Sequence, residues 1–173
     1  MNSNKKIINP LYNQVPVVGN KYSNGDWQKY AIHDDKNIKG FFGEYRYLSN
    51  FHVADVYFDG LKYPSSECAY QAAKTLETSL REEFVSMTPS QAKKGGSIID
   101  LRPDWEDVKT EVMASIVFDK FYRNIDLRRK LIETGDKYLE ESNHWSDRTW
   151  GVCKGTGENR LGRILMRTRS FWS

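Results

Sequence analysis

The strongest local signal in the chain is the segment VADVYFDGLKYP, residues 53–64. Two short aromatic and β-branched runs flank Asp59-Gly60, a pair that suits the left-handed positions of a type I′ hairpin turn. Ser65 and Ser66 follow, and either can cap a helix that begins directly after the hairpin. The chain is therefore expected to join a tight β-hairpin to a short helix without a linker.

Helical signals dominate the rest of the sequence. The segment TPSQ at 88–91 can form a capping box, and Gly95-Gly96 ends the helix that it begins. Apolar periodicity and capping residues predict three later helices, at 104–121, 124–135 and 159–169. KYLEES at 137–142 is expected to be a short strand, and residues 143–159 a long loop.

These elements predict an α+β fold, a single helix-dominated domain with a small β-hairpin or sheet. We place this domain at residues 39–173 and a polar, turn-rich arm at residues 1–38. Turn signals in the arm are Asn24-Gly25 and Asp34-Asp35, and its candidate anchors on the main body are Trp27, Tyr30 and Ile32.

Composition limits the class of protein. No apolar run reaches membrane-spanning length, and the N-terminal 20 residues lack a continuous apolar core, so we expect a cytoplasmic protein. Cys68 and Cys153 form no disulfide framework, and the three histidines lack metal-ligand spacing. We therefore expect neither a metal site nor a cofactor.

The positive charge is concentrated near the C-terminus, although the formal net charge is only +3. On the predicted last helix, an apolar face of Leu161, Ile164 and Leu165 is separate from a basic stripe of Arg160, Arg163 and Arg167. A solvated helix face is the more common meaning of such a stripe. The alternative is a positive field that attracts an anionic substrate.

The helix after the hairpin carries an unusual polar row. At 100° per residue, Glu67, Gln71 and Lys74 fall within about 60° of one another, with Tyr70 at the margin. The opposite side holds only small residues, Cys68, Ala69, Ala72 and Ala73. An ordinary exposed Glu/Lys face is about as probable from this segment alone, but the small-residue back and the preceding hairpin favour a site. Glu67, ionised in the first helical turn, could act as a general base or stabilise positive charge on a sugar.

The second group of candidates lies in the loop at 143–159. Asp147 and Trp150 belong to a segment longer than a simple connection needs. Gly155, Gly157 and Asn159 lead into the basic helix, whose free N–H groups could bind a phosphate, although a flexible Gly-rich turn is the better interpretation of that stretch alone. Elsewhere, Trp105 is more often a core anchor but could stack on a base.

Six ordered motifs resemble the NADAR family (NAD- and ADP-ribose-associated proteins). They are FFGEYRYLSNF, YPSSECAYQAAK, RPDWEDVK, LIETGDKYLEES, DRTWG and GENRLGRILMRTR, between about Phe41 and Arg169. The family includes an N-glycosidase that breaks down early riboflavin-pathway intermediates and hydrolases that remove ADP-ribose from guanine bases in DNA. It often has His where this chain has Cys68.

The resemblance implies roles for individual residues. It makes Glu67, Trp105 and Asp147 essential and assigns Lys74 to the removal of ADP-ribosyl groups. The further substrate-binding candidates are Asn50, Phe51, Tyr70, Gln71, Trp150, Gly151, Asn159 and Arg163.

Three classes of function follow. The leading one is an N-glycosidase that cleaves a C1′–N bond in a phosphorylated ribosyl or ADP-ribosyl substrate, either free or on a DNA guanine. The others are an ADP-ribose-binding module without turnover and a nucleic-acid-binding protein that uses the basic stripe. The four residues Glu67, Lys74, Trp105 and Asp147 together favour catalysis, and the small net charge argues against general nucleic-acid binding.

Overall fold

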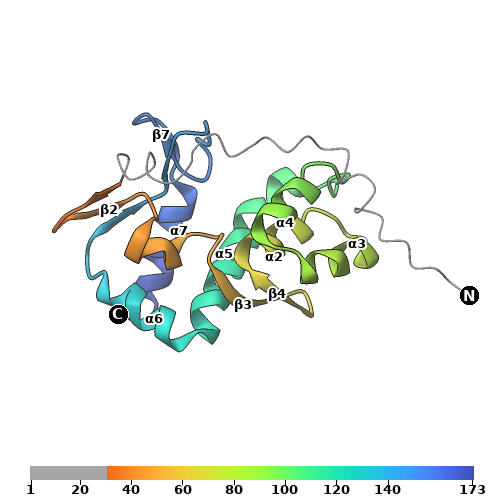
Figure 1. The fold of residues 1–173 in the computed structure, drawn as a ribbon, viewed down its shortest axis with the longest axis horizontal. Helices are drawn as coiled ribbons and strands as arrows, with labels where there is room; N and C mark the ends of the chain where they lie inside the picture. Colours follow the sequence, from red (N-terminus) through yellow and green to blue (C-terminus); the bar gives the residue numbers. More distant parts are fainter. Residues whose placement is uncertain (1–30) are drawn as a thin grey trace, which may run out of the picture. The chain divides into compact units, whose positions relative to one another are not determined.

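The computed structural model describes residues 31–173, which group into two compact units (Figure 1). Of these residues, unit 1 comprises 53–120, and unit 2 comprises 31–52 and 121–173. Helices and short strands occur in both units, which confirms the predicted α+β class. In the described part of the chain, no helix is both long enough and apolar enough to cross a membrane.

The predicted hairpin opens unit 1. Strand β3 (Val53–Phe58) pairs antiparallel with β4 (Leu61–Ser65), with Phe58 opposite Leu61. Asp59 and Gly60 have φ values of 49° and 81°, the left-handed conformation that a type I′ turn requires. Arg81 donates a hydrogen bond to the Asp59 carboxylate and another, of 2.7 Å, to the carbonyl of Thr75, so the turn is tied to the helical part of the unit.

Helix α2 (Ser66–Ala72) follows β4 directly, as predicted, and the Ser65 side chain caps it by accepting a hydrogen bond from the N–H of Cys68. Helix α4 (Pro89–Gly95) begins with the expected capping box. The remaining helical segments of unit 1 are α3 (Thr78–Glu83), the 3-10 helix η3 (Phe84–Ser86) and most of α5 (Trp105–Arg123). Helix α3 has no counterpart among the helices predicted from the sequence.

Helix α2 is the centre of unit 1, because β3, β4, α3, η3 and α4 all contact it. Its Cys68, Ala69 and Ala72 are 0% exposed, and the small side chains allow this close packing. Other buried apolar side chains of unit 1 are Val56, Tyr63, Phe84, Met113, Ile116 and Val117.

A three-stranded sheet forms part of unit 2. Strand β1 (Ile32–His33) pairs antiparallel with β2 (Asn37–Lys39), which pairs in parallel with β5 (Tyr138–Glu140). The predicted Asp34-Asp35 turn connects the first two strands, and its Asp34 carboxylate accepts the N–H groups of residues 36 and 37. The boundary that we predicted between residues 38 and 39 thus falls inside β2.

The rest of the predicted arm lies outside the described residues. Asn24-Gly25, Trp27 and Tyr30 belong to that segment. Ile32 is described and is 52% exposed, so it does not anchor the arm in a core.

The loop predicted at 143–159 contains more structure than expected. Strands β6 (Ser142–Asn143) and β7 (Val152–Cys153) pair in parallel within this region. Each is only two residues long, too short for the sequence pattern to reveal.

The helices of unit 2 are the 3-10 helix η2 (Gly43–Leu48), α6 (Ile125–Glu133) and α7 (Arg160–Ser170). Asn124 occupies the N-cap position of α6, as predicted, but its side chain makes no capping hydrogen bond. On α7, Leu161, Ile164 and Leu165 are buried, which confirms the predicted apolar face.

Candidate active site

The polar row on α2 is buried. Glu67 and Gln71 are each 5% exposed, and Tyr70 is 6% exposed. An ordinary solvated helix face is therefore excluded for these three side chains. A buried carboxylate without a strong structural requirement is a candidate for chemistry, because burying a charge is unfavourable unless polar groups compensate it.

Gln71 supplies part of that compensation. Its Nε2 donates a hydrogen bond of 2.8 Å to Glu67 Oε1, one helical turn away. Its Oε1 is buried and accepts no hydrogen bond from any described residue, and the same holds for the hydroxyls of Tyr63 and Ser66. Because a buried polar atom without a partner costs about 1–3 kcal/mol, this region is not optimised for stability.

Lys74 lies just beyond the helix, not on it. The last residue of α2 is Ala72 and the C-cap is Ala73, so Lys74 lies in the turn after α2 and the prediction that it belongs to the helix is wrong. The Lys74 ammonium donates a hydrogen bond of 3.0 Å to the carbonyl of Gly96 at the end of α4. Burial lowers the pKa of Lys74, the negative charge of Glu67 opposes this shift, and the positive charge of Lys93 adds to it.

Trp105 lies next to the same group. Its ring centroid is 5.1 Å from that of Tyr70, and it is 5% exposed. The N–H of Arg102 donates a hydrogen bond of 2.7 Å to the carbonyl of Lys74, which attaches the start of α5 to the turn after α2. Unit 1 thus brings together five of the predicted site residues: Glu67, Tyr70, Gln71, Lys74 and Trp105.

Cys68, which stands where the family often has His, is a core residue. Its side chain is 0% exposed and donates a hydrogen bond of 3.2 Å to the carbonyl of Met87. Burial raises the pKa of this thiol to about 11. The thiol is therefore neutral near pH 7 and is not a nucleophile at this site.

Asp147, in unit 2, organises its own loop. Its Oδ1 accepts hydrogen bonds from the N–H groups of Thr149 and Trp150, at 3.0 and 2.9 Å. Asn143 holds the residue from the other side, because its Oδ1 accepts the Asp147 N–H at 3.1 Å and its Nδ2 donates to the Asp147 carbonyl at 2.7 Å. Asp147 itself is half-buried. Its backbone is therefore fixed, while its carboxylate remains partly exposed.

Asn159 is also held by structural hydrogen bonds. It is 2% exposed and has a left-handed φ of 51°. Its Oδ1 accepts from the N–H of Glu141 at 3.1 Å, and its Nδ2 donates to the Tyr138 hydroxyl and the Leu139 carbonyl at 3.0 and 2.9 Å. These bonds connect the start of α7 to the strand β5.

The N-terminus of α7 does not offer the free donors that we expected for a phosphate. The N–H groups of residues 159, 160 and 161 donate to the carbonyls of residues 151, 149 and 150. The prediction that these N–H groups are free is therefore wrong. They fasten the loop that contains Trp150 and Gly151 to the helix.

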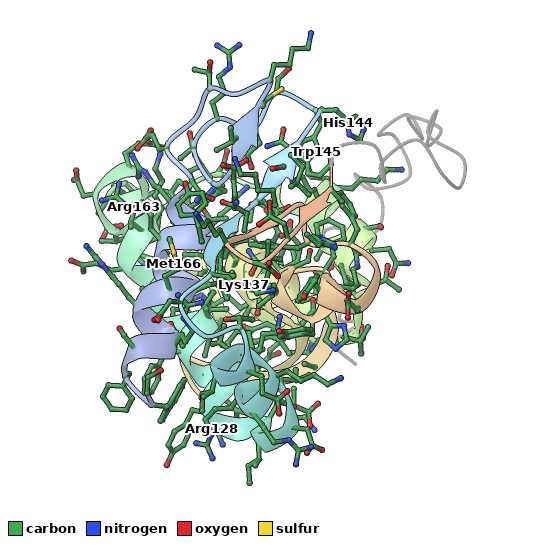
Figure 2. All side chains as sticks on the ribbon, turned by 90° about the vertical axis from the view of Figure 1, so that its left-hand side faces the viewer. Arg128, Lys137, His144, Trp145, Arg163 and Met166 are labelled. Carbon is green, nitrogen blue, oxygen red and sulfur yellow. The ribbon has the colours of Figure 1, made fainter. Side chains whose placement is uncertain are left out.

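The other predicted contacts also belong to unit 2. Arg163 is exposed on α7, as Figure 2 shows, and Trp150 is half-buried. Asn50 is 8% exposed, and the Phe51 ring lies 6.0 Å from the guanidinium of Arg46. A Cβ on Gly151 would lie 2.1 Å from the carbonyl oxygen of Glu141, so only glycine fits there.

The basic C-terminal stripe is smaller than the sequence suggests. Arg160 pairs with Glu158, with 2.8 Å between Nε and Oε2. Arg169, on the same helix, is 8% exposed and donates to Thr134 Oγ1 and the Lys137 carbonyl, at 2.7 and 2.9 Å. Arg163 and Arg167 remain exposed.

Two residues near the candidate groups were missed by sequence reasoning. Gly96 was interpreted only as a helix terminator, although it contacts both Gln71 and Lys74. Asn143, which lies in the predicted loop, fixes the backbone of Asp147. The sequence carries no local signal for either contact. Among residues 31–173, no group of three or more His, Cys, Asp and Glu side chains is arranged to hold a metal ion.

Comparisons with known proteins agree with the resemblance to the NADAR family. The NADAR domain family matches residues 34–171. N-glycosidase YbiA of Escherichia coli is 37% identical over 130 residues, which cover 73% of this chain and 81% of that protein. N-glycosidase Npun_R5314 of Nostoc punctiforme is 33% identical over 132 residues, which cover 72% of this chain and 84% of that protein.

A longer relative and a solved structure complete the comparison. Riboflavin biosynthesis protein VVA0006 of Vibrio vulnificus is 37% identical over 132 residues, but the match covers only 34% of its length. The NMR structure of E. coli YbiA superimposes with a TM-score of 0.72 and 32% identity, covering 84% of this chain and 89% of that chain. The chain therefore belongs to the NADAR family.

Proposed function

We propose that this chain hydrolyses the C1′–N bond of a phosphorylated ribosyl substrate, with Glu67 and Lys74 as its reactive groups. Relatives that match most of the NADAR region are N-glycosidases, so the chain is a hydrolase of the N-glycosidase type. The observation that carries the residue assignment is a buried Glu67 held by Gln71, near enough to Lys74 for its charge to oppose the lowering of the Lys74 pKa by burial.

Glu67 is suited to charge stabilisation or proton transfer. When the C1′–N bond breaks, the nitrogen leaves with the bonding electrons and positive charge develops on the ribose. A carboxylate fixed near C1′ stabilises that charge and can accept a proton from the attacking water. The product nitrogen gains a proton, and C1′ gains the hydroxyl of the water.

Lys74 offers a covalent route for a substrate whose ribose ring has opened. Opening leaves a C1′=N bond to the base, and a neutral lysine amine can displace the base as an amine and form its own C1′=N bond. Water then hydrolyses this Schiff base, which restores the lysine and releases the sugar aldehyde. The lowered pKa of Lys74 increases the fraction of neutral amine that this route needs.

Two substrate classes fit this chemistry. The first is an early ribosylamino intermediate of riboflavin biosynthesis, which the name of the Vibrio relative favours. The second is ADP-ribose attached to a guanine of DNA, which the covalent chemistry of Lys74 favours. Arg163, exposed on α7, is a proposed contact for the phosphate of either substrate.

Asp147 is a second candidate for activating water. Only its Oδ1 is engaged by the N–H groups of the loop, and the side chain is partly exposed. Trp105 in unit 1 and Trp150 in unit 2 are separate candidates for stacking on the base. We also propose Asn50, Phe51, Tyr70, Gly151 and Asn159 as part of the substrate-binding regions.

A product assay tests the function. Purified protein is incubated separately with ADP-ribosylated guanosine DNA and with the ribosylamino intermediates, and the released ADP-ribose or ribose 5-phosphate is quantified. Release from one substrate class identifies the reaction. Tight binding of ADP-ribose without release from either substrate would instead establish a binding module and contradict the proposal.

A further inference from the structure

Gly96 has no conformational reason to be glycine. As the C-cap of α4, its φ and ψ values are −69° and −7°, which any residue adopts. The reason lies in its surroundings. A Cβ on Gly96 would lie 1.9 Å from Oε1, 2.8 Å from Cδ and 2.9 Å from Cβ of Gln71. The Gln71 carboxamide therefore occupies the space that any larger residue at position 96 would need.

The packing against Gly96 places the Gln71 carboxamide on Glu67. With Oε1 against Gly96, Nε2 points to Glu67 Oε1 at 2.8 Å. The reversed amide would place two acceptor oxygens together, which an ionised carboxylate disfavours. The orientation persists although Oε1 is buried and has no partner among the described residues, which is unfavourable for stability.

Gly96 also contacts the second reactive group. Its carbonyl accepts the Lys74 ammonium at 3.0 Å. Gly96 thus contacts both residues. The Gln71 carboxamide packs where a side chain at position 96 would lie, and the Gly96 carbonyl accepts the hydrogen bond from Lys74.

We infer that Gly96 and Gln71 are positioning residues that fix Glu67, and through the Gly96 carbonyl also Lys74, for the reaction. This inference rests on the proposed function. The inference adds that Gly96, at the end of α4, determines the position of the Glu67 carboxylate on α2. Misplacing a catalytic group by about 1 Å can lower the rate by up to about 100-fold.

The variant Gly96→Ala tests this inference, because it keeps the carbonyl for Lys74 but pushes on the Gln71 carboxamide. We expect kcat to fall at least about tenfold while KM changes less than about threefold, since a positioning defect acts on the reacting group. The matched background is Gln71→Gly, which removes Oε1, Cδ and Cβ, the three Gln71 atoms that a Cβ at position 96 would meet. There, the added Gly96→Ala substitution should lower kcat by less than about threefold.

Three outcomes would overturn the inference. Gly96→Ala could keep the wild-type kcat, or it could change only KM. In the double variant, the fold-decrease in kcat could equal the product of the fold-decreases in the two single variants. If Gly96→Ala does not fold by circular dichroism, Gln71→Met decides, because it keeps Gly96 and removes the hydrogen bond to Glu67. Wild-type kcat in Gln71→Met contradicts the inference. A Glu67→Gln variant with full activity would instead refute the role of Glu67 in the proposed function, and binding without product release by the wild-type protein would refute the function itself.

Discussion

Helix α2 in unit 1 and the loop at 143–159 in unit 2 both bury polar side chains, but they satisfy them differently. In the loop, both ends of the Asn143 and Asn159 amides form hydrogen bonds to the chain. On α2, the Gln71 amide uses only its nitrogen, for the carboxylate of Glu67. The two loop amides are thus fully satisfied and hold the loop in place, whereas the Gln71 amide on α2 leaves a buried oxygen without a partner among the described residues.

The comparison predicts that removing the Asn143 hydrogen bonds lowers the stability of the protein. Asn143→Ala removes two hydrogen bonds to Asp147 and one of 3.3 Å to the Val152 carbonyl from a site that is 3% exposed. We expect the free energy of unfolding to fall by roughly 3 kcal/mol. For a chain of this size, that change lowers Tm by about 6–12 °C.

Thermal unfolding followed by circular dichroism measures this effect. The matched control is Thr156→Ala, an exposed side chain in the same loop, which should change stability by less than about 0.5 kcal/mol. Equal Tm values for the two variants would show that the Asn143 hydrogen bonds are not structural, and the contrast with α2 would disappear.

For Lys74 we predict the opposite of the Asn143 result, a loss of turnover without a loss of stability. Lys74→Met should lower turnover at least about tenfold while leaving Tm unchanged or higher, because it removes a charge that burial disfavours. Since the pKa of Lys74 is lowered in the folded protein, folding releases a proton between that pKa and 10.5. The wild-type protein should therefore gain stability as pH rises through this window, and Lys74→Met should lose that gain.

The pH profile and chemical trapping sharpen the role of Lys74. If its neutral amine attacks the sugar, kcat/KM rises with pH toward a pKa below 10.5, and borohydride with substrate adds a sugar mass to the protein. Lys74→Arg should then be inactive. An active Arg variant with no mass adduct would limit Lys74 to holding a phosphate.

Local signals explain which parts of the fold could be predicted. The hairpin turn at Asp59-Gly60 and the caps at Ser65 and Thr88 depend on residues within a few positions of one another, and all three are confirmed. The parallel pairing of β2 with β5 joins segments about a hundred residues apart. No local turn sequence predicts a pairing between such distant segments. For this reason residues 37 and 38 were predicted to belong to the arm.

The candidate site was predictable to the same extent. Glu67 and Gln71 follow from helical spacing, and their hydrogen bond confirms that they share a face. Lys74 departs from the helix although Ala72 and Ala73 favour helix formation, and its carbonyl bonds instead to Arg102. The contact of Gly96 with Gln71 depends on tertiary packing. The Gly95-Gly96 pair in the sequence indicates only the end of a helix, not this contact.

The most direct test compares turnover and stability in Glu67→Gln. The isosteric amide can still contact Gln71, so we expect Tm to stay within about 2 °C of the wild-type value. Without the carboxylate, kcat should fall about 100-fold or more in the product assay. A folded Glu67→Gln protein with wild-type turnover would contradict the account, as would a variant that loses activity only because it unfolds.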